Sequence, residues 1–320
     1  MEEIKLTHIE RIEIKGLWGK YDIKWTLDPS VNIITGVNGC GKSTILNLIE
    51  TLLLEEVPLD GFDPEFLSLV KIGFNGNKFL LQDGKLYDDN YNTFLYDELL
   101  SVSKISTFDA VRKFNFKKQP TQEVKTELDF ELMMVVEEFN SYLQKLGEKE
   151  KKETAILEQK IKEITQKNKL TDEEFKCIGK YYNEIEQFRS RIYKKRNLLY
   201  IILNELFETN NKSIEYNGHT AFIVKDGNRN LKIYDLSAGE KQILLILLKV
   251  SVFHSQPMVL LLDTPELALH ALWQANLVDM INKLNPNCQI IIATHSPNVF
   301  GKRWRNKVVN MKDITTLLVS

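Results

Sequence analysis

The stretch GVNGCGKST, residues 36–44, limits the possible folds of this chain more than any other feature. It matches the pattern G-x-x-x-x-G-K-[ST] and stands between the apolar segment VNIIT and the helix-like segment ILNLIETLL. Glycines in this pattern let backbone N–H groups turn inward around phosphate oxygens, and the helix that follows adds the positive end of its dipole. The motif therefore predicts a nucleotide-phosphate site at the end of a buried strand. The residues expected to form it are Gly36, Asn38, Gly39, Cys40, Gly41, Lys42, Ser43 and Thr44.

Three polar side chains are expected to complete this site around ATP and Mg²⁺. Lys42 can reach the β- and γ-phosphates, and Ser43 can offer its hydroxyl to Mg²⁺. The apolar segment MVLLLD, residues 258–263, reads as a buried strand that ends in Asp263. We expect this carboxylate to hold the hydration shell of Mg²⁺. The plainer alternative for Asp263 is a cap on the helix that follows.

Composition indicates a soluble globular protein. The chain has 320 residues, of which 43% are hydrophobic and 27% charged, and its formal net charge of −2 does not indicate a polycation that binds nucleic acid. Its three cysteines lie far apart, which argues against a zinc site or a disulfide framework and suits a reducing cytosol. The longest apolar run, residues 243–253, is too short to span a bilayer and reads as a buried helix. We expect a cytoplasmic protein without a membrane partner.

The order of the segments predicts an α/β fold with a helical insertion. Residues 1–127 and 209–320 carry strand patterns, with a hairpin at 78–88 and a meander after residue 212. In the last third, strands alternate with helices, which implies a parallel sheet covered by helices. Residues 128–208 have few glycines and dense charge, and we assign them to a separate helical insertion. The two flanking segments would form one discontinuous head domain.

Within residues 128–208, apolar side chains recur every three or four positions, as on one side of a helix. Thr171 and Glu174 have the spacing of a capping box for a second helix. We predict two long helices that fold back as an antiparallel, coiled-coil-like arm; the alternative is a helical subdomain packed on the core. The apolar series are Leu132, Val136, Phe139, Leu143 and Leu146, and then Phe175, Ile178, Tyr182, Ile185, Phe188, Ile192, Leu199, Ile202 and Leu206.

The segment LSAGEKQ, residues 236–242, precedes a strongly apolar helix. Ser237 and Glu240 alone would be an ordinary capping box. Downstream of the phosphate loop and ahead of the strand that ends in Asp263, the segment resembles the signature motif of ABC-type ATPases, the class that includes SMC and Rad50-like proteins. The resemblance implies a P-loop NTPase of the ABC/SMC-head type. It also implies that Ser237, Gly239 and Glu240 meet the γ-phosphate held by a second copy of the chain, with ATP between the two heads.

The segment IIIATHSPNVF places His295 just past a strand, with Ser296 and Pro297 as the start of a short helix. In the class that the chain resembles, this His hydrogen-bonds the γ-phosphate and helps to orient water. That class also has a polar residue near Mg²⁺ between the phosphate loop and the arm. Gln82 has a plausible spacing but falls in the expected hairpin, so we favour Asp109 as this metal ligand.

Hydrolysis is the uncertain step, because Thr264 follows Asp263 where many ATP-hydrolysing proteins have a second acid. A Thr hydroxyl can hydrogen-bond water but cannot accept a proton at neutral pH. Glu266 is the nearest other acid, yet it lies beyond Pro265, and we expect it to point elsewhere. His295, Glu266 and Thr264 are the candidate catalytic residues. Two mechanisms stay open: a slow ATPase, and a clamp that holds ATP without turnover.

Three segments are similar to the OLD-related ATPases: the N-terminal segment through the phosphate loop, LALHALWQ (residues 267–274), and ATHSPNVFGKRW (residues 293–304). That family often serves in prokaryotic anti-phage defence. The layout resembles stand-alone ATPase subunits that work with a separate effector such as a nuclease, as in PARIS- or Septu-like systems. The alternative is a DNA-repair ATPase of the RecF or Rad50 kind. Basic clusters at 112–118, 194–196 and 302–307 could contact DNA or an acidic partner, although the usual explanation of such runs is a solvated face.

Overall fold

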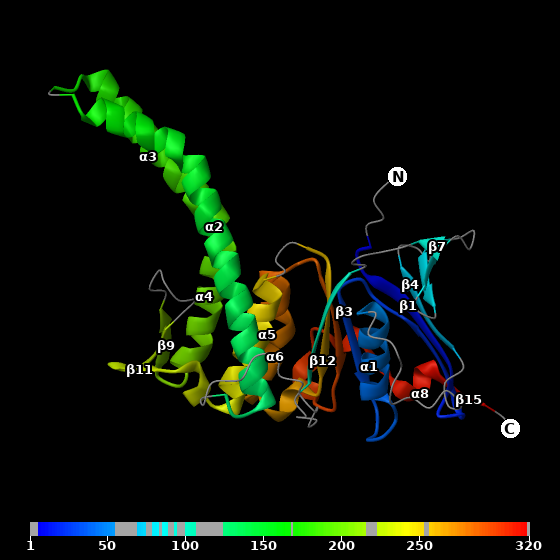
Figure 1. Cartoon of the computed structure of the whole chain (residues 1–320). Coiled ribbons are helices and arrows are strands. Elements are labelled where there is room, and N and C mark those ends of the chain that lie inside the picture. Colours follow the sequence, from blue (N-terminus) through cyan, green and yellow to red (C-terminus); the bar gives the residue numbers. More distant parts are fainter. Residues whose placement is uncertain are drawn as a thin grey trace. The chain divides into compact units, whose positions relative to one another are not determined.

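The computed structural model shows two compact units, one built from residues 1–119 with 237–320 and the other from residues 120–236 (Figure 1). We call the first unit the head and the second the helical unit. The described residues are 6–54, 69–74, 79–82, 85–88, 93–94, 100–106, 124–167, 169–215, 223–252 and 256–318.

A parallel sheet lies at the centre of the head, with strand order β14-β3-β13-β12-β8. Helix α1 (Lys42–Leu53) lies on one face of it, and α5 (Ala238–Val252) and α6 (Ala271–Leu284) lie on the other (Figure 1). Because both faces are covered, the inner strands β12 and β13 are buried at every position, as their apolar sequences require. The predicted α/β architecture and the buried helix after residue 237 are confirmed. The strands are β3 (Val31–Thr35), β8 (Ser101–Ser106), β12 (Met258–Asp263), β13 (Cys288–Ala293) and β14 (Val308–Asn310).

An antiparallel sheet forms the second layer of the head, in the order β15-β2-β1-β4-β5-β6-β7. Its inner face joins α1 and the parallel strands in one apolar core, which includes Trp25, Ile49 and Ile291. The predicted hairpin is present as β5 and β6, with Gln82 opposite Lys85. The strands are β1 (Ile9–Leu17), β2 (Tyr21–Thr26), β4 (Leu69–Phe74), β5 (Phe79–Gln82), β6 (Lys85–Asp88), β7 (Thr93–Phe94) and β15 (Thr315–Leu317). Two short helices, α7 (Pro297–Phe300) and α8 (Met311–Ile314), lie near the end of the chain.

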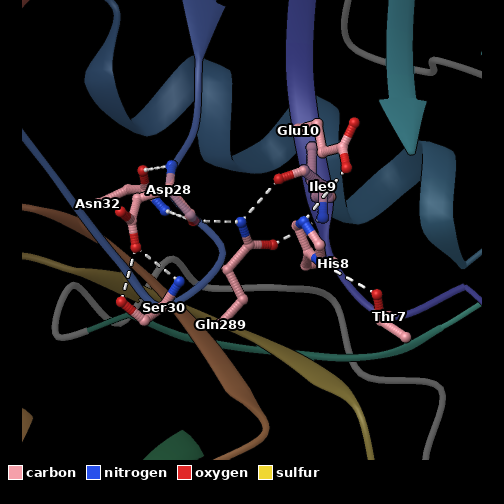
Figure 2. Close-up of polar contacts among 8 residues, drawn as sticks. All are labelled: Thr7, His8, Ile9, Glu10, Asp28, Ser30, Asn32 and Gln289. Carbon is pink, nitrogen blue, oxygen red and sulfur yellow. Dashed lines mark hydrogen bonds and ion pairs between the residues drawn. The ribbon is translucent and has the colours of Figure 1, made fainter. Parts of the chain in front are cut away.

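A buried glutamine joins the two sheets (Figure 2). The Gln289 side chain on β13 accepts a hydrogen bond from the Ile9 N–H at 2.8 Å and donates to the carbonyl oxygens of Ile9 and Asp28, at 2.7 and 2.8 Å. Gln289 is fully buried, so its amide would be costly without these partners. Their presence fixes the start of β1 against the parallel sheet that carries the predicted site.

Asp28 anchors the turn before β3 (Figure 2). Its Oδ1 accepts hydrogen bonds from the N–H and the hydroxyl of Ser30, at 2.9 and 2.6 Å, and its Oδ2 accepts one from Lys307. Burial raises the pKa of this carboxyl, but the hydrogen bonds from Lys307 and Ser30 outweigh that effect and lower the pKa to about 2. The turn that leads into the phosphate loop is therefore held by a carboxylate that stays ionised.

The helical unit is a helical hairpin with a small sheet. Its helices are α2 (Glu127–Thr165), α3 (Asp172–Ile192) and α4 (Lys194–Glu208), and its antiparallel strands are β9 (Lys212–Glu215), β10 (Ile223–Asp226) and β11 (Arg229–Leu231). α2 and α3 pack along each other in opposite directions (Figure 1). At 1.5 Å per residue, α2 is about 58 Å long. The predicted capping box of Thr171 and Glu174 is present, as is the meander.

The helical unit differs from the sequence prediction in three respects. The returning helix is interrupted at Tyr193, where the Tyr193 hydroxyl and Arg189 both hydrogen-bond Glu150 of α2, at 2.6 and 2.5 Å. Two residues of the expected apolar seam, Phe175 and Tyr182, are 60% and 54% exposed. Residues 209–236, which we expected in the head, fall within this unit, because Asn204 of α4 hydrogen-bonds both the N–H and the carbonyl of Ile214. Among the described residues, no helix is long and apolar enough to cross a membrane.

Candidate functional site

The carboxyl ends of β3, β13 and β12 lie next to one another in the head, and each leads into one predicted motif. In the strand register, Ile34 pairs with Ala293, and Ala293 pairs with Asp263. The phosphate loop, the His295 segment and the turn after Asp263 therefore leave the sheet at the same level. Open α/β sheets bind their ligands at this edge.

The loop between β3 and α1 has a shape that depends on glycine. Gly41 has a φ of 101°, which disfavours any side chain, and a Cβ there would lie 3.0 Å from Cη2 of Trp18. Lys42 is 5% exposed, and its Nζ donates hydrogen bonds to the carbonyl oxygens of Gly36 and Val37, both at 3.1 Å. The lysine charge is thus kept inside the loop, where phosphate oxygens can replace these carbonyls as its partners.

A pocket of about 760 Å³ opens beside this loop. Its lining includes loop residues 38–39 and 41–44, together with Thr264, Glu266 and His295. A second pocket of about 740 Å³ adjoins the first and is lined in part by Gly36 and Cys40. The predicted loop residues therefore all face one of two adjoining cavities, each of a size suited to a small ligand.

Asp263 and Thr264 lie at the carboxyl end of β12, and both are buried. The Thr264 N–H donates to the carbonyl oxygen of Ala293 at 2.8 Å, which continues the contact between β12 and β13 by one residue. Thr264 then adopts φ 49° and ψ 50°, the left-handed region that a β-branched residue rarely enters. This conformation costs about 1–2 kcal/mol. The left-handed conformation of Thr264 turns the chain sharply at the position where many ATP-hydrolysing proteins have the second acid.

Glu266 lies in the pocket, and our expectation that it points elsewhere was wrong. Its Oε1 accepts a hydrogen bond from the His295 N–H at 2.7 Å. Its Oε2 is buried and has no hydrogen-bond partner among the described residues. The left-handed turn at Thr264 and the short 3₁₀ turn Pro265–Leu267 bring this carboxylate back toward β13. A carboxylate is therefore present in the pocket, two residues later in the chain than usual.

The segment after β13 has the predicted form. His295 is exposed and lines the pocket. Ser296 caps α7 by accepting a hydrogen bond from the Asn298 N–H at 3.3 Å, with Pro297 as the first helical residue. The hydroxyl of Ser296 also donates to Oε1 of Gln274 at 2.9 Å. The helix start is real, and it holds His295 beside the pocket.

The start of α5 is the predicted capping box. The Glu240 carboxylate accepts hydrogen bonds from the N–H and the hydroxyl of Ser237, both at 2.9 Å, and is almost fully buried, whereas Ser237 is exposed. Gly239 packs against the backbone of Ala268, so closely that a Cβ would lie well inside van der Waals contact of the Ala268 carbonyl oxygen. The signature segment therefore touches the turn that carries Glu266, while the lining of the pocket itself does not include Ser237.

The remaining expectations divide between described and undescribed residues. Asp109 and the basic cluster 112–118 lie outside the described residues. In the cluster 194–196, Arg196 lies 4.0 Å from the ring centre of Tyr193, and burial lowers the pKa of Lys195. In the cluster 302–307, Arg303 pairs with Asp279 at 3.0 Å, and Lys307 pairs with Asp28. Arg196, Arg303 and Lys307 are thus engaged within the chain.

Two residues of the site carried no role in the sequence interpretation. Trp18, in the turn between β1 and β2, lines both pockets and has a φ of 54°. Its position between Gly16 and Gly19 was the available signal for a special turn. Gln274, on the buried face of α6, hydrogen-bonds both the turn after β12 and the segment after β13. A polar residue in an otherwise apolar helix face was the signal for it.

The model of one protein family, described as "AAA domain, putative AbiEii toxin, Type IV TA system", matches residues 31–301. The chain is 32% identical over 88 residues to the Retron Ec83 probable ATPase of Escherichia coli, covering 24% of this chain and 16% of that protein. It is 30% identical over 113 residues to the Retron Vc95 probable ATPase of Vibrio cholerae serotype O1 biovar El Tor, covering 31% and 21%. The chain thus matches only about a fifth of either relative's length.

The fold is similar to a solved Smc head domain from Pyrococcus furiosus, which has an extended coiled coil and is bound to the C-terminal domain of ScpA. The TM-score is 0.50 and the sequence identity 14%, over 97% of this chain and 96% of that chain. At this identity the likeness concerns the fold alone. The fold is that of a P-loop ATPase head of the SMC type, as the sequence predicted.

Proposed function

The chain belongs to the family described as AAA domain, putative AbiEii toxin, Type IV TA system, and from this premise we propose that it is an ATP-binding ATPase that acts as a nucleotide-gated, dimerising clamp. One observation carries the proposal. Three adjacent strand ends bring Lys42, the Thr264–Glu266 turn and His295 to one pocket, while Ser237 lies exposed outside it. Such an arrangement can hold one nucleotide and offers the serine to another.

The donor set fits ATP with Mg²⁺. Lys42 has a buried charge whose present partners are neutral carbonyls, so phosphate oxygens are stronger partners for it. Ser43 at the start of α1 and Asp263 at the end of β12 are the described oxygen groups that suit the metal, and Asp109 is the third ligand we propose. When bound, Mg²⁺ would neutralise charge on the β- and γ-phosphates.

Exposed apolar side chains favour a second copy as the partner. Leu267 and Leu272 are 58% and 63% exposed, and Leu267 directly precedes Ala268, which packs against Gly239 of the signature segment. Burying two leucines and capping a phosphate with Ser237 are both achieved when a second head covers this face. ATP would then act as the link between the two heads.

Hydrolysis is proposed to be slow. The Thr264 hydroxyl cannot accept the proton of an attacking water. The Glu266 carboxylate can do so, but its Oε1 is engaged by the His295 N–H and its Oε2 is buried, so the carboxylate has to move before it can accept a proton from water. His295 would hydrogen-bond the γ-phosphate. A base that reaches the pocket through a strained turn is expected to position water less well than an acid placed directly after Asp263.

We also propose that the chain serves in prokaryotic anti-phage defence, as a sensor or scaffold subunit with a separate effector such as a nuclease. The similarity of its termini to OLD-related ATPases supports this role, and the name of its family refers to a toxin–antitoxin system. We prefer it to a DNA-repair role of the RecF or Rad50 type. Arg303 and Lys307, which a DNA contact at residues 302–307 would use, are paired with Asp279 and Asp28.

Native mass spectrometry with and without ATP and Mg²⁺, on protein purified together with the products of neighbouring genes, tests the clamp. We expect an ATP-dependent dimer, which Lys42→Ala abolishes through loss of ATP binding. Ser237→Arg should abolish the dimer while ATP binding persists. A wild-type chain that stays monomeric at saturating ATP would refute the clamp, and an effector that co-purifies would identify the partner.

Steady-state phosphate release tests the slow hydrolysis. We expect a wild-type turnover below about 1 per second at 25 °C, against about 10 for an ordinary enzyme. Thr264→Glu should raise this turnover, and Glu266→Gln should lower it. A wild-type rate above that limit would contradict the proposal. An unchanged rate in Thr264→Glu would show that another residue activates the water.

A further inference from the structure

Gln274 is the residue through which the two loops beside the pocket are joined. It lies in the first turns of α6, is 8% exposed, and stands beside the apolar positions Trp273, Leu277 and Val278 of the same buried face. A primary amide in such a place costs free energy unless its hydrogen-bonding groups are satisfied. Its presence therefore needs a partner for each group.

All the hydrogen bonds of this amide go to the two loops. Its Nε2 donates to the carbonyl oxygen of Glu266 at 3.1 Å and to that of Leu269 at 2.8 Å. Its Oε1 accepts from the Ser296 hydroxyl at 2.9 Å. A glutamine amide has two N–H donors, and both are used here. The side chain thus fastens the two ends of the turn after β12 and ties them to the segment after β13.

A second link closes the connection. The Glu266 carboxylate accepts a hydrogen bond from the His295 N–H, next to Ser296 in the chain. Glu266 is therefore held at its backbone by Gln274 and at its side chain by His295. Neither loop can move away from the other without breaking one of these bonds.

The turn has one backbone hydrogen bond of its own, from the Leu267 N–H to the Thr264 carbonyl oxygen at 3.2 Å, so the bonds from Gln274 add support that the turn lacks. Thr264 is held in the left-handed region, and Pro265 has no N–H to donate. Nearby, Gly239 of the signature segment packs against Ala268, between the two carbonyls that Gln274 binds. A displacement of the turn would therefore also displace Gly239 at the start of α5 or break its contact with Ala268.

We propose that Gln274 is a positioning residue that holds Glu266 and His295 in one fixed arrangement and connects both to the signature segment. The inference rests on the proposed ATPase function for its kinetic effect. The physical connection itself does not depend on turnover, so the two can be tested separately.

The test compares Gln274→Met and Gln274→Glu with Asn276→Ala. Met has a similar size and no amide. Glu keeps the acceptor for Ser296 and loses both donors. Asn276 is exposed on the same helix and hydrogen-bonds only within it, through the Leu272 carbonyl, so its variant is the matched control. If Gln274→Met fails to fold, Gln274→Glu carries the test.

The first measurement is hydrogen exchange of the peptides that cover residues 264–269 and 294–300, without nucleotide. Both peptides should exchange at least about threefold faster in the Gln274 variants and unchanged in Asn276→Ala, because the local opening free energy falls when these bonds are lost. Unchanged exchange in both peptides would overturn the inference, whether or not the protein hydrolyses ATP.

The second measurement separates turnover from binding. We expect kcat to fall at least tenfold in the Gln274 variants, since small displacements of catalytic groups have large effects on rate. The Kd for ATP should change less than about threefold, because the phosphate loop is untouched. Equal losses in kcat and affinity would indicate a merely structural role and overturn the inference. A wild-type chain that neither binds nor hydrolyses ATP would refute the proposed function, and exchange alone would then decide the role of Gln274.

Discussion

Replacing Gly239 by alanine tests the contact between the signature segment and the turn that carries Glu266. The new Cβ would lie well inside van der Waals contact of the Ala268 carbonyl oxygen, which is backbone and cannot rotate away. Overpacking of this kind costs about 1–3 kcal/mol. A glycine-to-alanine change in a helix by itself gains up to about 1 kcal/mol. We therefore expect a net loss of stability of about 1–2 kcal/mol.

Gly179→Ala is the matched control, because Gly179 lies inside the exposed helix α3 and a Cβ there meets no atom within 4 Å. This change should stabilise the protein by about 0.5–1 kcal/mol. The two variants make the same chemical change, and the structure gives them opposite signs.

Thermal unfolding followed by circular dichroism measures the difference. For units of this size 1 kcal/mol corresponds to about 2–4 °C, so Gly239→Ala should lower Tm by about 2–8 °C and Gly179→Ala should raise it by about 1–4 °C. Hydrogen exchange over residues 264–269 should quicken in Gly239→Ala alone. A Gly239→Ala protein as stable as wild type, with unchanged exchange, would refute the contact.

Two further predictions concern Asp28 and Gln289, which lie where the parallel sheet meets the antiparallel sheet. The depressed pKa of Asp28 means that its ionised form stabilises the fold above pH 3.8, and that this contribution is lost as pH falls from there toward about 2. Asp28→Asn should therefore be less stable than wild type by about 1–2 kcal/mol at pH 7, after allowance for solvent screening, and the gap should close near pH 2; urea unfolding at several pH values checks this. Gln289→Met should lose about 3 kcal/mol, because three backbone groups, two of them buried, lose their partners, whereas Gln144→Met on an exposed face of α2 should be neutral. A neutral Gln289→Met would show that water or movement replaces the amide.

Much of the fold could be predicted because local patterns and tertiary structure agree. The unbroken apolar runs of β12 and β13 require cover on both faces, and the alternation in β1 and β2 requires it on one. The phosphate loop could also be predicted, because its glycines and its place between a strand and a helix both serve to bind phosphate. The capping boxes at Thr171 and Ser237 are local hydrogen bonds, so spacing alone was sufficient.

The helical unit shows where periodicity stops being informative. An apolar residue at every third or fourth position predicts a helix, but it does not reveal which positions are covered. Phe175 and Tyr182 continue the pattern yet lie exposed, because the hairpin there has only two helices and a narrow contact. At the break, the Tyr193 hydroxyl hydrogen-bonds Glu150, more than forty residues earlier, and no local rule connects the two.

The position of Glu266 could not be predicted for a related reason. From the sequence, an acid two residues after Asp263 and beyond a proline should leave the site, and an extended chain would indeed carry it away. The left-handed conformation of Thr264 reverses that direction, and nothing in the residue type announces it, since a β-branched side chain disfavours this region. The strained turn persists because neighbouring groups hold it: Ala293 binds the Thr264 N–H, and Gln274 binds the carbonyls beyond it. Whether an acid is available for hydrolysis therefore depends on where Glu266 lies in space, and not only on the residue at position 264. The activity of Glu266→Gln decides whether Glu266 replaces the acid that is absent at position 264.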